Sequence, residues 1–387
     1  MSPARRSPVT VTRRQVAAWR MRRQYLDPRT DVAAEEIVSR LCGVQAQVWS
    51  AAETAVALRQ VTPDGDGVDR ASAGLSLMKT WAMRGTLHLL PPAEAGAYLS
   101  VMETVAFWLK PSWQRVSGVN PRQLDELTDK VAEVLDVDGP LTRDQLVQEV
   151  VADPRFTGLE DRLRSGWGQV LKPLAWRGVL CHGPAQGNRI TFAHPARQYP
   201  QWRERPDADE AAPRVVAAYL GAYGPATPEV FDRWLSVGSS SRPRLRGWFA
   251  ALGDALTPVD VEGETAWLAA EHVDELAGSG PCTGLRLLGA FDQYVLGPGT
   301  GDGTLLPREH RSAVSRTAGW ISPVVVLDGR IAGVWDVVDG ELVVSPFAGA
   351  GPLPREDLER EAEHVARARG SSRLPLRETP AREGDVP

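Results

Sequence analysis

The sequence of 387 residues has few cysteines and no histidines at metal-ligand spacing. The 3 cysteines, Cys42, Cys181 and Cys282, are far apart, which excludes a disulfide scaffold and a Cys-x-x-Cys zinc or iron–sulfur site. The 6 histidines show no His-Glu-x-x-His pattern, and no P-loop, nucleophile elbow or Gly-x-Gly-x-x-Gly after a strand occurs. We therefore expect neither a bound metal nor an organic cofactor.

Long apolar runs are missing as well. No basic start is followed by an apolar stretch, and no run reaches the roughly eighteen apolar residues that a membrane span needs. We therefore expect a cytoplasmic protein without a membrane partner, and we expect it to be a monomer.

Lysine is scarce, so arginine carries most of the positive charge. The formal net charge is −5, which argues against a protein that coats nucleic acid along its whole surface. Residues 1–30 nevertheless hold eight arginines against one aspartate. This basic N-terminus could be a solvated helix face or could meet a phosphate backbone, and charge alone does not decide between them.

One pattern occurs three times along the chain: two or three amphipathic helices followed by a short hairpin, with acidic or Gly/Pro-rich loops between the repeats. This pattern is typical of a winged helix. We predict an α+β fold in which three tandem winged-helix units, 1–118, 119–205 and 206–280, precede a small antiparallel β domain with a terminal helix at 281–370. Residues 371–387 have few apolar side chains, so we expect a disordered tail there.

Local signals place the elements of these units. Helices are expected to start at three capping boxes, formed by Thr12 and Gln15, Ser50 and Glu53, and Thr142 and Gln145. Another helix should start at Thr227, because Pro228 follows it. Strands at 179–182 and 189–193, and at 256–261 and 266–268, form the second and third hairpins, and strands at 285–290, 321–327, 331–338 and 342–347 form the last sheet.

Two short segments project polar groups from apolar strands. Gln45 and Gln47 alternate with apolar residues after Gly43, so both should point to one face. A strand is predicted for 84–90, and in it Arg84, Thr86 and His88 should also point to one face. Cross-strand amide pairing and a satisfied polar network explain such residues without any function, and spacing alone favours that explanation.

At these residues the sequence resembles the AlkZ family of DNA glycosylases, winged-helix proteins with a motif of Gln, an apolar residue, and Gln or Asp. The motif stands here as Gln45-Ala46-Gln47, and the resemblance also covers 83–89, 287–297 and 319–329. It implies a monofunctional enzyme that hydrolyses the N-glycosidic bond of N7-alkylated guanine in double-stranded DNA. The implied substrates include bulky adducts and interstrand crosslinks formed by genotoxic natural products. The implied biological role is DNA repair or self-resistance.

The resemblance makes Gln45 and Gln47 the catalytic pair. A glutamine amide is no general base, so it can only orient a water through its carbonyl and offer a dipole to an oxocarbenium-like transition state. Such a site needs a good leaving group, and N7-alkylguanine is cationic and leaves as a neutral base. We expect Gln47 to position the water, Gln45 to hold the water or the sugar, and weak activity on uracil.

Several residues are expected to contact DNA, mostly through phosphates around a channel between the units. They are Arg84, Thr86, His88, Trp49, Ser50, Arg242, Arg244 and Arg246, together with the N-terminal arginines. Trp81 is a further candidate for stacking on bases. Asp292 could cap a local turn or approach the lesion.

The main alternative is a non-catalytic winged-helix DNA-binding protein, such as a transcriptional regulator, because a fold does not establish an activity. A regulator should prefer one sequence over random DNA, whereas a glycosylase should prefer damage over sequence. A repair protein that binds adducts without cutting is a third reading.

Overall fold

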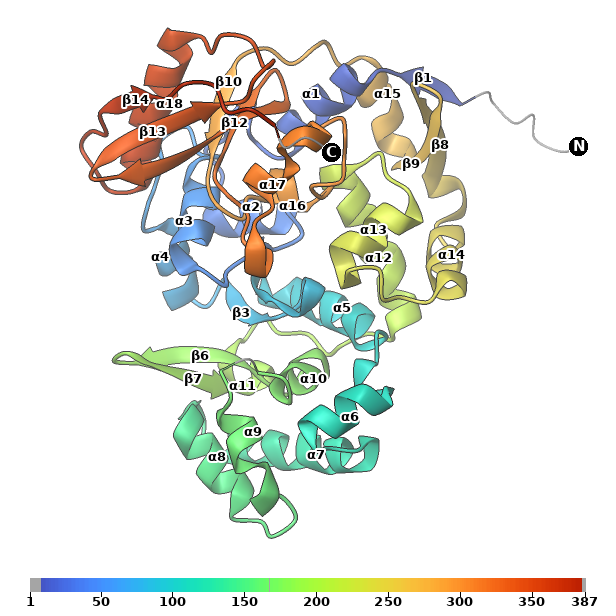
Figure 1. Cartoon of the computed structure of the whole chain (residues 1–387). Helices are drawn as coiled ribbons and strands as arrows, with labels where there is room; N and C mark the ends of the chain where they lie inside the picture. Colours follow the sequence, from blue (N-terminus) through green and yellow to red (C-terminus); the bar gives the residue numbers. More distant parts are fainter. Residues whose placement is uncertain (1–7, 167, 385–387) are drawn as a thin grey trace, which may run out of the picture.

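The computed structural model describes residues 8–166 and 168–384, in which helices alternate with small sheets. The predicted α+β class is therefore confirmed. The described strands form three three-stranded sheets and one five-stranded sheet. Figure 1 shows a lower lobe, which holds the elements from α6 (Pro111–Ser117) to α11 (Pro195–Gln198), beneath a larger upper body.

The first part of the upper body has a sheet of order β2-β4-β3, antiparallel throughout. Its elements are α2 (Ala34–Arg40), β2 (Val44–Gln45), α3 (Trp49–Ala57), α4 (Gly67–Ala73), β3 (Met78–Trp81), β4 (Leu87–Leu90) and α5 (Pro92–Glu103). The predicted box of Ser50 and Glu53 is wrong, because α3 already begins at Trp49 and its N-cap, Val48, makes no side-chain cap bond.

The lower lobe has a sheet of order β5-β7-β6. Its elements after α6 are α7 (Pro121–Val137), β5 (Leu141–Thr142), α8 (Arg143–Val151), α9 (Glu160–Arg164), α10 (Leu171–Trp176), β6 (Cys181–Gln186), β7 (Arg189–Ala193) and α11. The capping box of Thr142 and Gln145 is confirmed, and Asn120 forms another with Gln123.

The third sheet joins distant parts of the chain. Helices α12 (Ala208–Tyr223), α13 (Pro228–Ser236) and α14 (Arg242–Ala250) lead into β8 (Leu256–Val261), β9 (Glu264–Ala269) and α15 (Val273–Ala277). Thr227 caps α13 as predicted. The N-terminal strand β1 (Val9–Val11) pairs in parallel with β8, and α1 (Arg13–Arg23) follows it after the predicted cap at Thr12. The unit predicted for 1–118 is therefore wrong at its start, which belongs to the third sheet.

The C-terminal sheet is the predicted antiparallel meander with one added strand. Its order is β10 (Leu285–Leu288), β11 (Val324–Leu327), β12 (Arg330–Val338), β13 (Glu341–Pro346) and β14 (Leu376–Glu378), and α18 (Arg355–Ala368) packs against it. Because β14 pairs in parallel with β13, the disordered tail predicted for 371–387 is wrong through residue 384. Residues 385–387 lie outside the described part.

A continuous hydrophobic core joins the first three sheets. It includes Trp81 of β3, Trp176 of α10, Phe192 of β7 and Tyr219 of α12. The Trp81 ring lies 5.2 Å from His182 and 6.1 Å from Phe192, so the first sheet packs directly on the hairpin of the lower lobe. No helix among the described residues is long and apolar enough to cross a membrane.

Candidate active site

The Gln45-Ala46-Gln47 motif lies where β2 ends and the chain turns into α3. Gly43 makes the entry to β2 possible, because its φ of +95° is in the left-handed region and an added Cβ would lie 2.8 Å from Leu90. The Ala46 amide donates to the Leu87 carbonyl at 2.7 Å, which fixes the motif against β4. The strand is shorter than predicted, since Gln45 is its last residue and Gln47 lies beyond it.

Gln45 is held by Arg84. The Gln45 side-chain carbonyl Oε1 accepts a hydrogen bond from Arg84 Nη2 at 3.0 Å, and the residue is only 7% exposed. Arg84 Nη1 donates to the backbone carbonyl of Trp234 in α13 at 3.0 Å. Arg84 does not lie in a strand as predicted: its φ of 57° places it in a left-handed turn before β4. This turn directs the guanidinium toward the motif.

His88 completes this network as a neutral ring. It is fully buried, its Nδ1 lies 3.0 Å from the Thr86 carbonyl, and its Nε2 lies 3.4 Å from Arg84 Nη2. Burial, and then the Arg84 charge, lower the pKa of His88 to about 3. With Nδ1 protonated and donating to Thr86, Nε2 offers its lone pair to Arg84. The predicted phosphate contact of His88 is therefore wrong.

Arg84 remains charged at neutral pH, although burial lowers its pKa to about 10. The charged groups that act on it include no carboxylate. None of the hydrogen bonds that Gln45, Gln47, Arg84 and His88 make within the described chain goes to a carboxylate. Within the described residues, the hydrogen-bond network of the motif therefore holds one cation and no carboxylate.

Gln47 is exposed, in contrast to Gln45. Its Oε1 lies 3.4 Å from the Leu87 backbone amide, a long hydrogen bond that leaves a lone pair of the oxygen open. Both glutamines thus approach the start of β4, at Arg84 and Leu87. Of the two amides, Gln47 is the one that solvent reaches.

The other residues predicted beside the motif differ in accessibility. Thr86 is half-buried and its hydroxyl donates to the Met83 carbonyl at 3.2 Å. Trp49 donates from its indole to Asp69 at 2.8 Å and lies under Lys79. Ser50 is exposed in the first turn of α3. Trp81 is buried in the core, so its predicted stacking on bases is wrong.

The three arginines of α14 are exposed, as DNA contacts require. Arg242, Arg244 and Arg246 all lie on the outer surface of this helix, while Leu245 and Trp248 face the core. Arg244 donates to the Thr104 carbonyl at 3.3 Å, and none of the three has an ion pair in the described chain. No carboxylate of the described residues neutralises these three guanidinium groups.

Most of the N-terminal arginines are structural instead. Arg20 is buried and pairs with Asp302 at 2.9 Å. Arg29 binds both carboxylate oxygens of Glu361, at 2.7 and 2.8 Å, and Arg13 pairs with Glu262 and Glu264. The expectation that this basic segment meets phosphates is wrong for these residues, whereas Arg5 and Arg6 lie outside the described part.

Asp292 is a structural residue as well. It is 0% exposed and binds Arg59, also 0% exposed, through two hydrogen bonds of 2.8 Å. It also caps α16 (Gln293–Leu296) by accepting from the Tyr294 amide. The capping role is therefore confirmed, and the predicted approach to a lesion is wrong.

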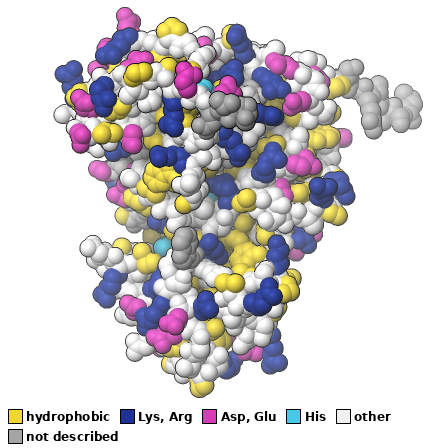
Figure 2. Space-filling model, in the orientation of Figure 1, with side chains coloured by type: hydrophobic (Ala, Val, Ile, Leu, Met, Phe, Trp, Pro, Cys, Tyr) yellow, Lys and Arg dark blue, Asp and Glu magenta, His cyan; other side chains and the backbone are white. Residues whose placement is uncertain are grey.

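A hollow with hydrophobic walls lies on the other side of Arg84, at the waist between upper body and lower lobe, where Figure 2 shows hydrophobic side chains gathered. We call this cavity of about 450 Å³ the aromatic cavity. Its main lining residues are Arg84, Met102, Val105, Phe107, Trp113 and Trp176. No sequence pattern predicts this cavity, because its residues come from four separate segments.

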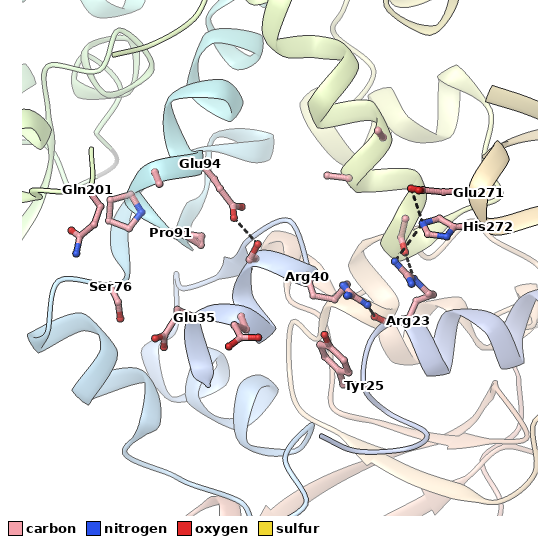
Figure 3. Close-up of a pocket in the computed structure, with 17 residues that line it drawn as sticks. Arg23, Tyr25, Glu35, Arg40, Ser76, Pro91, Glu94, Gln201, Glu271 and His272 are labelled. Carbon is pink, nitrogen blue, oxygen red and sulfur yellow. Dashed lines mark hydrogen bonds and ion pairs between the residues drawn. The ribbon is translucent and has the colours of Figure 1, made fainter. Parts of the chain in front are cut away.

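A cavity of mixed charge, about 660 Å³ in volume, lies elsewhere, between α1, α2, α5 and α12 (Figure 3). Some of its polar groups bind one another or the backbone: Ser39 donates to Glu94 at 2.6 Å, and Arg23 donates to the Gly221 carbonyl at 2.8 Å. Neither motif glutamine lines it. Among residues 8–166 and 168–384, no three His, Cys, Asp or Glu side chains gather as a metal site would require.

The chain is similar to known proteins in both sequence and structure. A family model described as DNA glycosylase AlkZ-like matches residues 38–368. A relative from Streptomyces sahachiroi named interstrand DNA cross-link repair glycosylase is 65% identical over 365 residues, which cover 94% of this chain and 98% of the relative. The solved structure of the Streptomyces sahachiroi DNA glycosylase AlkZ matches with a TM-score of 0.94 and 64% identity, over 96% of this chain and 100% of the other. The chain therefore belongs to the AlkZ-like family of DNA glycosylases.

Proposed function

We propose that this protein is a monofunctional DNA glycosylase that hydrolyses the N-glycosidic bond of cationic N7-alkylguanine in double-stranded DNA. Bulky adducts and interstrand crosslinks belong to its substrates, which accords with the name of the 65% identical relative. The observation that carries the proposal is the motif network itself: two amides, one of them fixed by a charged arginine, beside a histidine whose pKa is lowered to about 3.

The fixed amide gives Gln45 its role. Because Oε1 accepts from Arg84, the Nε2 group is left as a donor that faces away from the guanidinium. A donor at this point can hold the oxygen of the attacking water or an oxygen of the sugar. Arg84 and His88 act as positioning residues, since they orient Gln45 and do not reach the reacting atoms.

The exposed amide of Gln47 then orients the water. Its carbonyl oxygen can accept a hydrogen bond from the water and so direct a lone pair of the water oxygen at C1′ of the sugar. The amide dipole also stabilises the positive charge that develops on the sugar in an oxocarbenium-like transition state. Neither step needs a base, which suits two amides that hydrogen-bond to no carboxylate within the described residues.

The hydrolysis of the glycosidic bond needs neither a general acid nor a general base. The C1′–N9 bond breaks with its electron pair going to the base, so the cationic N7-alkylguanine leaves as a neutral molecule. The water oxygen forms the new bond to C1′, and its spare proton passes to solvent. A neutral base such as uracil would leave as an anion, so we expect poor release of uracil.

DNA is bound mainly through its phosphates. We assign this to the exposed arginines of α14, with Ser50 and Trp49 beside the motif. The small sheets with their helices serve as three winged-helix units around the DNA. The protein works as a monomer in the cytoplasm, where no metal or cofactor takes part.

The test is release of the damaged base from two duplexes, one with N7-methylguanine and one with uracil. The proposal predicts release of N7-methylguanine in a single-turnover assay, with far slower release of uracil. Tight binding of both duplexes without release of either base would favour a non-catalytic DNA-binding protein. Equal release of both bases would contradict the argument from the leaving group.

A further inference from the structure

The aromatic cavity is coupled to the catalytic motif through Arg84. One guanidinium nitrogen binds Gln45 and the other binds the Trp234 carbonyl of α13, each at 3.0 Å. Helix α13 ends at Ser236, which lines the aromatic cavity, and Gly85 next to Arg84 lines it too. A group bound at the motif would therefore have this cavity directly beside it.

The walls of the aromatic cavity are suited to a flat apolar group. The Phe107 ring packs edge-on against Trp176 with 5.1 Å between centroids, and 5.8 Å from Trp113. Met102 and Val105 complete this wall. Rings held in fixed positions offer preformed stacking and edge contacts to another aromatic group.

The charged residues that line the aromatic cavity favour some groups over others as its occupant. Two cations, Arg84 and Lys172, line the aromatic cavity, and none of its lining residues is an Asp or Glu. Lys172 has no hydrogen bond or ion pair within the described ranges, and burial lowers its pKa. Arg84 contacts both the motif and the cavity, so Lys172 is the cation that the cavity adds. A positively charged N7-alkylguanine base is therefore disfavoured in the cavity relative to the motif, whereas a neutral aromatic ring attracts nearby cations through its π face.

We infer that the aromatic cavity is a subsite for the planar aromatic part of a bulky substituent on N7 of guanine, while the guanine itself stays at the Gln45-Ala46-Gln47 motif. This inference rests on the proposed function. N7 lies on the major-groove edge of the base, so its substituent projects away from the sugar and can occupy a separate site. The subsite selects adducts by the shape and charge of the substituent.

The test compares two substrates that differ only in the N7 substituent: a duplex with N7-methylguanine and one with N7-(naphthylmethyl)guanine. The main variant is Ser239→Trp, because Ser239 lines the aromatic cavity from an exposed position and a large side chain there fills the space without disturbing the core. A second variant, Phe107→Ala, removes one stacking ring. The control is Ser372→Trp, at an exposed serine outside the cavity.

We expect Ser239→Trp and Phe107→Ala to lower kcat/KM for the naphthylmethyl substrate by about tenfold, the usual effect of losing one stacking partner. Release of N7-methylguanine should stay at the wild-type rate, and Ser372→Trp should change neither. Equal losses on both substrates, or no loss on the naphthylmethyl substrate, would overturn the inference while leaving the proposed function intact. A wild type that frees neither base overturns the proposed function itself.

Discussion

The buried pair of Arg59 and Asp292 leads to a quantitative prediction for the variant Asp292→Ala. Both side chains are 0% exposed and share two hydrogen bonds of 2.8 Å. Asp292 also accepts from the Tyr294 amide at 2.8 Å as the cap of α16. The substitution therefore leaves a buried guanidinium without a counter-charge and a short helix without its cap.

The expected cost is large. Breaking a buried ion pair from one side costs about 3–5 kcal/mol, and losing a helix cap costs about 1 kcal/mol. Because the carboxylate carries both interactions, we expect the free energy of unfolding to fall by roughly 4 kcal/mol. Urea denaturation followed by circular dichroism measures this change, with Asp254→Ala, at an exposed aspartate, as the control.

The same variant separates a structural role from a catalytic one. Since Asp292 is enclosed by Arg59 and the start of α16, base release per folded molecule should stay at the wild-type rate. The double variant Arg59→Met/Asp292→Ala should recover part of the stability, because no unpaired charge is left in the core. A stability loss below about 1 kcal/mol would refute the reasoning, as would a stable variant that has lost base release.

Further predictions concern the motif network and the DNA surface. The variant Arg84→Met removes the hydrogen bond that fixes Gln45. It should slow release of N7-methylguanine by roughly tenfold to a hundredfold, as expected for a lost hydrogen bond to a charged group. DNA affinity, measured by fluorescence anisotropy, should change little. Because the pKa of His88 is lowered to about 3 and that of Arg84 to about 10, the single-turnover rate should be flat from about pH 5.5 to 8.5, and a titration near the ordinary histidine pKa would contradict this. Replacing Arg244 and Arg246 together by Ala should weaken binding to any DNA sequence and flatten the slope of log affinity against log salt by roughly 0.9 per lost phosphate contact, and an unchanged slope would place the DNA elsewhere.

Local chemistry made much of the fold predictable. The capping boxes at Thr12 and Thr142 and the cap at Thr227 depend on residues within one turn, so the sequence alone identifies them. The predicted box at Ser50 failed because α3 begins two residues earlier, with Val48 as its N-cap directly after the motif. Hairpin turns such as Asp339-Gly340 also follow from local preferences, and both residues have positive φ values.

Long-range pairing was not predictable. Arg20 pairs with Asp302 and Arg29 pairs with Glu361, each across more than half of the chain. The sequence therefore did not reveal that these N-terminal arginines have carboxylate partners. Strand β14 depends on an open edge of β13 that no local pattern reveals. In the site, the Gln45-Ala46-Gln47 motif is visible in the sequence, but the left-handed turn at Arg84 that holds Gln45 is not.

The central claim is that two amides orient a water without a general base. The most direct measurement is the single-turnover rate of N7-methylguanine release by wild type, Gln45→Ala and Gln47→Ala, with Gln148→Ala, at an exposed glutamine on α8, as the matched control. We predict losses of roughly 10²–10³-fold for both motif variants, in the range of other preorganised amide groups in active sites, and none for the control. Release that survives in both motif variants at the wild-type rate would contradict the account.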